Sequence, residues 1–369
     1  MENCTKNQRF IQCFFIISVW INVRIIYEFV SGINYGGKFD VMIEYSGACE
    51  YKSWQYLRFF ANVLRNHKTD HRTESKKEIN HKIMISNIKK IGFIGIGLIG
   101  GSIARSLHVN LPQAELIAFD RHEDNMAPAL DDGVISKGIL NFDGSFYEDC
   151  DVIFLCTSVL NSKPYLDALT GHLSPDTILT DVGSVKGEIF SLIRESELEV
   201  NFVGGHPMAG TEKFGYVNSF PELLIGANYV LTPSEKVSSD KVMRLKELVE
   251  LMGSKTMVLT PERHDLCAAA ISHVPHVLSY SLANMIRQED DTDNAMRLMA
   301  AGGLRDMTRI ASSAPKMWEQ ICLANKDNVV ALLDEYISII SNMRDIIARE
   351  DGEALRNEFA KGKEYRDTF

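Results

Sequence analysis

The chain has 369 residues, 45% of them hydrophobic, a length that predicts a sizeable buried core and two domains. The formal net charge of -10 and the lack of a long basic run exclude the surface typical of a nucleic-acid-binding protein, and favour small molecules and other protein chains as partners. Seven cysteines without disulfide-like spacing indicate a reducing compartment, so we expect a cytoplasmic protein.

Residues 1–86 differ in composition from the rest of the chain. They contain 12 basic and 8 acidic residues, whereas the remainder contains 27 basic and 41 acidic residues. The apolar run 10–23 resembles a signal or anchor core but is too short to predict a membrane span. We interpret residues 1–86 as a poorly ordered extension or a misread start, with Met84 as a natural beginning, and predict no membrane partner. An intact mass that includes Met1 would contradict the misread start.

The stretch 90–101, KIGFIGIGLIGG, predicts a strand, a tight turn and the start of a helix. Gly95, Gly97 and Gly100 have the spacing of a dinucleotide-binding loop, in which the first glycine bends the chain, the second lets the backbone approach a pyrophosphate, and the third packs helix against strand. Leu98 and Ile99 lie within this loop and are predicted to contact the cofactor too. The helix N-terminus would offer its N–H groups to the phosphates.

A second strand-like run ends at Asp120, about twenty residues after Gly100, where a dinucleotide-binding unit places the acid that binds the ribose 2′-hydroxyl. A carboxylate there repels a 2′-phosphate, which favours NAD over NADP as the cofactor. Arg121, directly after Asp120, leaves NADP as an alternative. The same pattern would also fit a glycine turn and a capping aspartate in an unrelated α/β sheet.

Strand-like and helix-like stretches alternate from residue 89 to residue 259. The apolar runs lie at 91–95, 116–120, 152–156, 177–181, 201–204, 229–232 and 256–259, and stretches such as 241–252 have helical spacing. Apolar strands crossed over by helices imply a mostly parallel, doubly wound sheet. We therefore predict an α/β fold, with a Rossmann-type NAD-binding domain over residues 87–260.

Strand signals stop after Pro261. Helical patterns cover 263–287, 294–301, 316–347 and 353–361, with breaks expected at Pro275, Gly302-Gly303 and Pro315. Several of these helices are apolar on more than one face and so require burial on both sides. Residues 261–369 are predicted to form an all-helical dimerisation and substrate domain, and the protein to be a homodimer.

Three polar segments are candidates for the site chemistry. Ser184 lies in DVGSVK and could reach the nicotinamide or the substrate, and His206 lies in a glycine-rich turn directly after a strand. A histidine is the usual proton acceptor when an alcohol is oxidised, and an arginine such as Arg309 is the usual clamp for a carboxylate. His206 could instead hold a loop, and Arg309 could be an ordinary surface charge. His273 and His276 are three residues apart, but no nearby Cys or Glu completes a metal site, so no metal is predicted.

The motifs in their order resemble the prephenate dehydrogenase family of tyrosine biosynthesis over residues 87–369. The resemblance rests on GIGLIGGS at 95–102, DVGSVK at 181–186, GGHPMAGTEKFG at 204–215, SHVPH at 272–276 and GGLRDMTRIASSAPKMW at 302–318. It implies oxidative decarboxylation of prephenate to 4-hydroxyphenylpyruvate with reduction of NAD. Some members of the family use arogenate and give tyrosine directly, and this alternative stays open.

The resemblance also implies roles for individual residues in the first domain. His206 resembles the catalytic histidine that draws the proton from the ring hydroxyl as hydride leaves the same carbon. Ser184 resembles a residue that supports this histidine beside the nicotinamide. Glu212 matches a position linked to closure and pH response of the site.

In the helical part, the resemblance implies a pocket for the substrate. Arg309 resembles the residue that holds a substrate carboxylate, and His276, Ser272 and Gly302 match positions that line the same pocket. Trp318 resembles an aromatic residue that reaches into the pocket of the partner subunit, which would make the dimer functional as well as structural.

Two other classes of protein share parts of this pattern. A β-hydroxyacid or ketopantoate-type dehydrogenase also has a Rossmann domain followed by helices, but its catalytic residue is a lysine in the helical domain. A non-catalytic NAD-sensing module would need the glycine loop but neither His206 nor Arg309. The presence of both residues favours an NAD-dependent dehydrogenase.

Overall fold

The structure is a computed structural model that describes residues 87–369 apart from residue 212 and residues 291–292. The interpretation of residues 1–86 as an extension or a misread start concerns a segment outside this range, and so does the role expected of Glu212.

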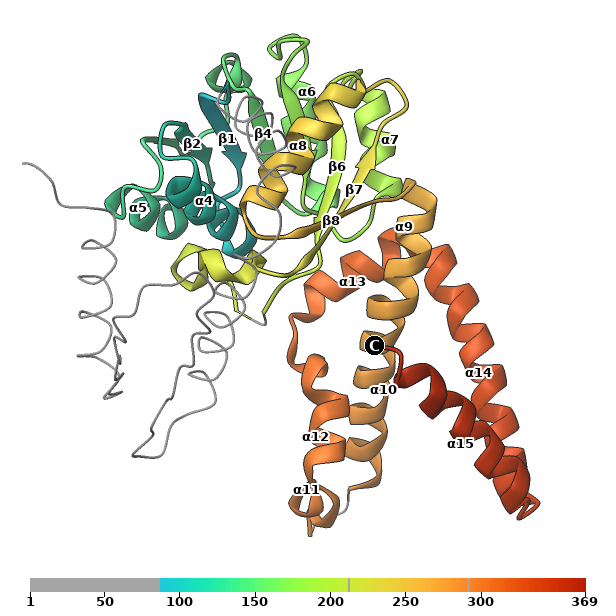
Figure 1. Cartoon of the computed structure of the whole chain (residues 1–369). Coiled ribbons are helices and arrows are strands. Elements are labelled where there is room, and N and C mark those ends of the chain that lie inside the picture. The colour runs from blue at the N-terminus through green and yellow to red at the C-terminus, as the bar shows by residue number, and fades with distance from the viewer. Residues whose placement is uncertain (1–86, 212, 291–292) are drawn as a thin grey trace, which may run out of the picture. The chain divides into compact units, whose positions relative to one another are not determined.

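A parallel sheet of five strands forms the centre of the first half (Figure 1), in the order β3-β2-β1-β4-β5. The strands are β1 (Lys90–Ile94), β2 (Glu115–Phe119), β3 (Lys137–Ile139), β4 (Val152–Leu155) and β5 (Ile178–Asp181). This confirms the predicted doubly wound α/β fold. Only β3 was missed, because its three residues, KGI, are too few to produce an apolar run.

A second sheet of three strands adjoins β5. It contains β6 (Val203–Pro207), β7 (Asn228–Pro233) and β8 (Lys255–Val258), with β6 and β7 antiparallel and β7 and β8 parallel. The connection from β6 to β7 contains only short 3₁₀ turns, and without a crossover helix the chain can return antiparallel. Because the backbone N–H of Gly205 donates to Asp181 Oδ1 over 3.0 Å, the carboxyl end of β5 lies beside β6.

Helices cover both faces of the parallel sheet. One hydrophobic core unites the sheet with α4 (Leu98–Asn110), α5 (Glu123–Asp131) and α8 (Ser239–Leu251). A second core unites it with α6 (Lys163–Leu169) and α7 (Gly187–Glu195). Successive side chains of a strand point to opposite faces, and Phe93 and Ile94 of β1 accordingly belong to different cores. Burial on both faces explains why the central strands are continuously apolar.

The second half of the chain is helical. Its elements are α9 (Pro261–Ala268), a π-helical turn (Ala269–His273), α10 (Val274–Glu289), α11 (Ala295–Met299), α12 (Gly302–Thr308), α13 (Pro315–Ala324), α14 (Lys326–Ala348) and α15 (Gly352–Arg366). Its buried hydrophobic core within the single chain is small, since it consists of Ala269, Val274 and Val329.

One of the predicted helix breaks is wrong. Pro275 does not end a helix but lies directly after the π-helical turn, in a helix that runs on to Glu289. A π-helical turn changes the backbone hydrogen-bond pattern, so the missing N–H of proline is accommodated at that point. The break expected at Gly302-Gly303 is present directly before Gly302, since α11 ends at Met299 and α12 begins at Gly302. A break that was not predicted separates α13 from α14 at Asn325.

By length and composition alone, one helical stretch of the described residues, Pro261–Glu289, could cross a membrane. Two of its buried polar residues are bonded within the protein, since His264 contacts His206 and Asp265 accepts hydrogen bonds from Lys186 and Gly187. Those contacts are typical of a helix that packs inside a folded protein.

Candidate active site

The glycine loop has the geometry that dinucleotide binding requires. Gly95 has a φ of +94°, which a side chain disfavours, and a Cβ on Gly100 would lie only 2.4 Å from the carbonyl oxygen of Gly95. At Gly97 a Cβ would meet no atom within 4 Å, so open space lies in front of the backbone there. Helix α4 begins at the next residue without a side-chain cap, and its first N–H groups are free for phosphate oxygens.

Asp120 lies at the carboxyl end of β2, beside the glycine loop. Its Oδ2 accepts hydrogen bonds from the N–H of Ile96 (2.9 Å) and from Asn125 Nδ2 (3.2 Å). The Oδ1 of Asn125 accepts in turn from the N–H of Tyr216 (2.9 Å), in the segment that follows β6. The predicted ribose-binding acid is thus connected both to the phosphate-binding loop and to the segment after His206.

His206 lies in β6, next to the carboxyl end of β5, and is 8% exposed. Its Nδ1 lies 2.8 Å from Nε2 of His264, the fourth residue of α9. Nδ1 of His264 lies 2.8 Å from Oδ1 of Asp265. Thr260 caps this helix by accepting from the N–H of Arg263, and Pro261 occupies its first turn, so its start is firmly set. Among the described residues, Nε2 of His206 has no hydrogen-bond partner.

A buried ion pair supports the backbone at His206. Nζ of Lys186 donates to Asp181 Oδ2 (2.5 Å) and to the carbonyl oxygen of Gly205 (2.7 Å), directly before His206. Burial lowers the pKa of Lys186, while Asp181 and Asp265 oppose this shift. The ammonium is fully buried against Asp181, so its role is to join β5 to β6.

Burial also determines the ionisation of His206. The loss of solvation lowers its pKa well below the ordinary 6.5, and Lys186, His264 and His273 lower it further. The imidazole is therefore neutral at physiological pH and can accept a proton.

A second group of predicted residues gathers in the helical part. The rings of His276 and Trp318 are stacked, with centroids 3.4 Å apart and an angle of 19° between planes. Burial, together with the charge of Arg309, lowers the pKa of His276 to about 4. The structure thus brings together three residues that the sequence resemblance assigns to the substrate pocket.

His273 lies between the two groups. It acts electrostatically on His206, its ring contacts Trp318 at a centroid distance of 6.1 Å, and its Nδ1 lies 3.2 Å from Asn325 Nδ2. Buried atoms without a hydrogen-bond partner among the described residues include Nε2 of His273, Nδ1 of His276 and Nε1 of Trp318. Such atoms are uncommon in proteins, and three in one place fit a site that a polar ligand completes.

The other predicted residues are less tightly placed. Ser184 lies half-buried in the segment after β5, and none of the described hydrogen bonds joins it to His206. Ser272 is half-buried in the π-helical turn, and Gly302 is the exposed first residue of α12. Trp318 stacks on His276 of its own chain; the contact with a partner subunit stays a prediction.

Sequence reasoning missed His264, Asp265 and Asn325. Asn325 joins the two groups, because its Nδ2 donates to the carbonyl oxygen of Asp265 (2.8 Å) and lies near His273. In the sequence, His264 and Asp265 read as ordinary polar residues in the first turn of a helix. The one available signal was their place just after the last strand, where a helix start adjoins the sheet.

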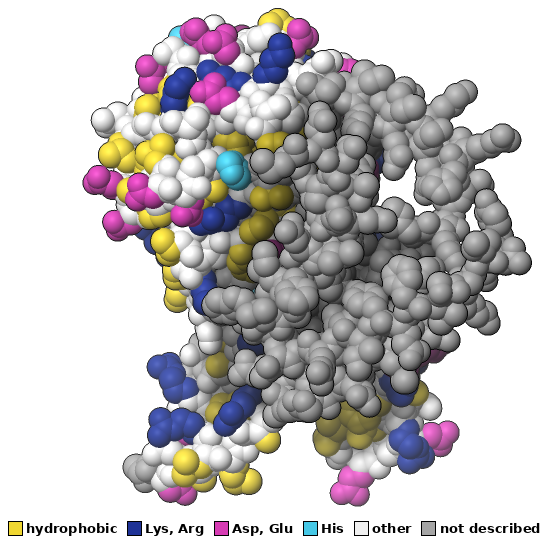
Figure 2. Space-filling view, turned by 60° about the vertical axis from the view of Figure 1, so that its left-hand side comes forward, with side chains coloured by type: hydrophobic (Ala, Val, Ile, Leu, Met, Phe, Trp, Pro, Cys, Tyr) yellow, Lys and Arg dark blue, Asp and Glu magenta, His cyan; other side chains and the backbone are white. Residues whose placement is uncertain are grey.

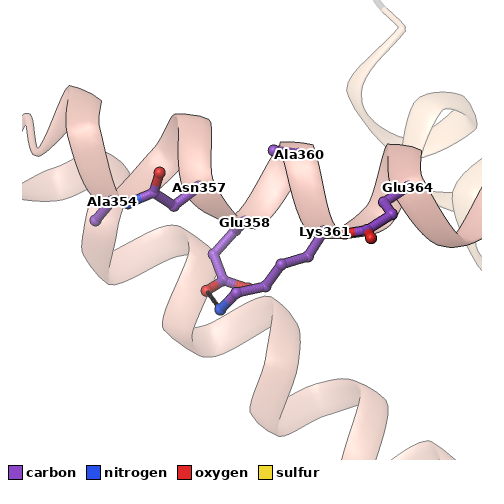
Figure 3. Close-up of a pocket in the computed structure, with 6 residues that line it drawn as sticks. All are labelled: Ala354, Asn357, Glu358, Ala360, Lys361 and Glu364. Atoms are coloured by element: carbon purple, nitrogen blue, oxygen red, sulfur yellow. Dashed lines mark hydrogen bonds and ion pairs between the residues drawn. The ribbon is translucent and has the colours of Figure 1, made fainter.

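One surface pocket lies apart from these residues. Figure 3 shows a pocket formed by α15 alone and lined by Ala354, Asn357, Glu358, Ala360, Lys361 and Glu364. Its only internal ion pair joins Lys361 to Glu358 over 2.7 Å, and none of the predicted site residues lines it. In the part of the chain that is described, no group of three or more His, Cys, Asp or Glu side chains could hold a metal ion.

The fold and these residues define an oxidoreductase that binds a nicotinamide dinucleotide. A phosphate-binding glycine loop, an acid at the end of β2 and a neutral, buried histidine at the carboxyl end of the sheet are the parts that such an enzyme needs.

Two family profiles match the chain. "Prephenate dehydrogenase, nucleotide-binding domain" matches residues 103–258, and "Prephenate dehydrogenase, dimerization domain" matches residues 260–361. The chain belongs to the prephenate dehydrogenase family, and it is an NAD-dependent oxidoreductase.

Individual relatives agree with this assignment. The chain is 36% identical over 275 residues to prephenate dehydrogenase of Bacillus subtilis (strain 168), covering 74% of each chain. It is 30% identical to cyclohexadienyl dehydrogenase of Zymomonas mobilis, covering 75% of this chain and 95% of that one.

Solved structures are similar over most of the chain. Prephenate dehydrogenase of A. aeolicus in complex with hydroxyphenyl propionate and NAD+ has a TM-score of 0.72 at 30% identity, covering 76% of this chain and 98% of that one. Arogenate dehydrogenase of Synechocystis has a TM-score of 0.67 at 31% identity, covering 76% and 99%.

Proposed function

We propose that the protein catalyses the NAD-dependent oxidative decarboxylation of prephenate to 4-hydroxyphenylpyruvate, with His206 as the base. The observation that carries this proposal is the state of His206. It is held at the carboxyl end of the sheet, its Nδ1 is engaged by His264, and burial keeps its pKa below the ordinary value. A neutral imidazole with a free Nε2 is the group that oxidation of an alcohol requires.

Apart from accepting one proton, the protein mainly has to orient the substrate relative to the cofactor. The proton of the ring hydroxyl passes to Nε2 of His206 as the hydride leaves the same carbon. When bound, the nicotinamide would supply the acceptor for that hydride. The carboxyl group then leaves as carbon dioxide, and its bonding electrons restore the aromatic ring and charge the ring oxygen. That oxygen takes up one proton, so His206 can return the one it accepted, and the proton balance closes within the site.

The substrate carboxylates would bind near the second group of residues. Arg309 is exposed and has no ion pair among the described residues, which leaves its guanidinium for a carboxylate. His276 and Trp318 present buried polar atoms without partners in the same place, and Ser272 and Gly302 lie on the adjoining turns. Ser184, beyond the end of β5, would face the nicotinamide.

We assign the cofactor contacts to the loop from Gly95 to Gly100 and to Asp120. The enzyme would act as a cytoplasmic homodimer through its helical part, since one of its family profiles is a dimerization domain. Figure 2 shows hydrophobic side chains at the surface of the helical part, in the lower region of the view. On α14 the exposed ones include Ile337, Ile340 and Ile347.

Arogenate is the alternative substrate. It differs from prephenate in carrying an amino group in place of the keto group, and relatives of this chain include a cyclohexadienyl dehydrogenase and an arogenate dehydrogenase. Both substrates carry the ring hydroxyl assigned to His206 and carboxylates for Arg309, so both fit the same chemistry.

Absorbance of the reduced cofactor tests the proposal directly. The full-length protein is assayed with prephenate and, separately, with arogenate, each with NAD and with NADP. We expect turnover of prephenate with NAD. Turnover of arogenate alone would change the substrate and keep the mechanism, whereas inactivity with both would reject the proposed function and favour a hydroxyacid substrate.

A further inference from the structure

Three buried side chains form a row that ends at the proposed base. His206 contacts His264, and His264 contacts Asp265, over 2.8 Å in each case. His264 is 2% exposed and Asp265 is 6% exposed, so water competes little for these hydrogen bonds. Asp265 is fixed in turn by α7, because its two oxygens accept from the backbone N–H groups of Lys186 and Gly187, over 2.7 Å each.

The order of donors and acceptors along the row determines which nitrogen of His206 carries hydrogen. In its ordinary ionised form a carboxylate only accepts hydrogen bonds, so the hydrogen of a neutral His264 lies on Nδ1, facing Asp265. Nε2 of His264 is then an acceptor. The hydrogen of His206 must therefore lie on its own Nδ1, and the lone pair of Nε2 is free.

We infer that His264, fixed by Asp265, is a positioning residue that holds His206 in the tautomer whose Nε2 can accept the substrate proton. This inference rests on the proposed function, because it assigns a task to the proposed base. Were the order reversed, Nε2 of His206 would carry a hydrogen and could not act as a base.

The row would also stabilise His206 after it has accepted the proton. Its Nδ1–H remains a donor to His264, and the negative charge of Asp265 lies one ring further on. Among the described residues, the other groups whose charge acts on His206 include Lys186 and His273, and Lys186 is paired with Asp181. Asp265 is thus the negative charge that the row connects to His206.

Nitrogen NMR of the NAD complex of the protein labelled with ¹⁵N-histidine determines the tautomer of His206 without an activity assay. The signals of His206 are assigned by their loss in His206→Asn. We expect wild-type His206 to carry hydrogen on Nδ1 and none on Nε2 at neutral pH. In His264→Phe, which cannot accept a hydrogen bond, we expect a mixture that includes the Nε2–H form. A wild-type His206 in the Nε2–H form would overturn the inference.

Kinetics provides the second readout. In His264→Phe we expect kcat for prephenate to fall by about ten- to a hundredfold, by analogy with the loss caused when the hydrogen-bond partner of a metal-binding histidine is removed. The KM for prephenate and the dissociation constant of NAD should change by less than about threefold. In His264→Gln, whose amide oxygen can accept from His206, most of the wild-type kcat should return. His172→Phe is the matched control, since His172 also contacts a carboxylate, Glu148, but lies outside the site; its kcat should equal that of the wild type.

The outcomes separate this inference from the proposed function. Normal turnover in His206→Asn would reject the proposed function itself. Loss of turnover in His206→Asn together with a wild-type kcat and tautomer in His264→Phe would overturn the role of His264 alone. The wild-type spectrum and His264→Gln still test the inference if His264→Phe fails to fold.

Discussion

At the scale of single residues, the surroundings of a few side chains determine their pKa values and their contacts. His206 and His276 are both histidines with lowered pKa values, yet one is engaged by a second histidine and the other is stacked on an indole. Burial is the main cause of the shift in both, and the contacts of each ring decide what the neutral ring can do.

We expect His206→Asn to lower kcat by about a hundred- to ten-thousandfold, the usual contribution of a general base. NAD should bind as in the wild type, because the glycine loop is untouched. In the wild-type enzyme, kcat/KM should fall with decreasing pH only below the ordinary histidine pKa of 6.5, since burial lowers the pKa of His206 and the protonated ring cannot accept. An acidic limb above that pH would point to another group.

Arg309→Gln should mainly raise the KM for prephenate. A hydrogen bond to a charged group contributes about 1.5 to 3 kcal/mol, so we expect a rise of roughly tenfold or more with a smaller change in kcat. Arg305→Gln is the control, because Arg305 is an exposed arginine one turn earlier, on α12. Equal KM values for both variants would remove Arg309 from the pocket.

At the scale of elements, the β1 to α4 loop has two glycines with different tasks. Gly97→Ala should leave the thermal unfolding midpoint nearly unchanged, because its Cβ meets no protein atom, but should weaken NAD binding where the pyrophosphate would approach. Gly100→Ala should lower the unfolding midpoint, because its Cβ would clash with the Gly95 carbonyl oxygen. Titration calorimetry with NAD and a thermal melt distinguish the two, and normal NAD affinity in Gly97→Ala would contradict the assignment.

The elements also show what the sequence could predict. The parallel sheet and the glycine loop were predictable, because each produces a pattern over consecutive residues. The strands appear as apolar runs, and the loop appears as a fixed spacing of glycines. The contact of His206 with His264 was not, because 58 residues separate them and only the placement of α9 beside β6 brings them together. The π-helical turn before Pro275 was likewise invisible, since proline ordinarily predicts a break.

At the scale of the whole molecule, the helical part exposes apolar surface that a partner subunit would cover. Its buried core within one chain is small, while α14 exposes Ile337, Ile340 and Ile347, at 60%, 49% and 58%. Exposed apolar surface of this kind ordinarily marks an interface. Proposed homodimer formation would bury it, and it would also decide whether Trp318 stays on His276 of its own chain or reaches a partner.

We expect Ile340→Asp to weaken the dimer by about 2 kcal/mol or more, as for a central interface residue. Light scattering over a dilution series measures this as a shift from dimer to monomer. Glu335→Gln, an exposed polar position on the same helix, should leave the dimer intact. A wild-type protein that is monomeric at every concentration would contradict the predicted homodimer.

The π-helical turn limits where this chain can gain or lose residues. The π-helical turn Ala269–His273 joins the part of the helix that bears His264 to the part that bears His276, so the number of residues in the turn affects the angle between the two parts. Deleting one residue there would turn His276 relative to His264 and move it away from Trp318. Length changes within the stretch from His264 to His276 would therefore misplace one of the two groups of site residues.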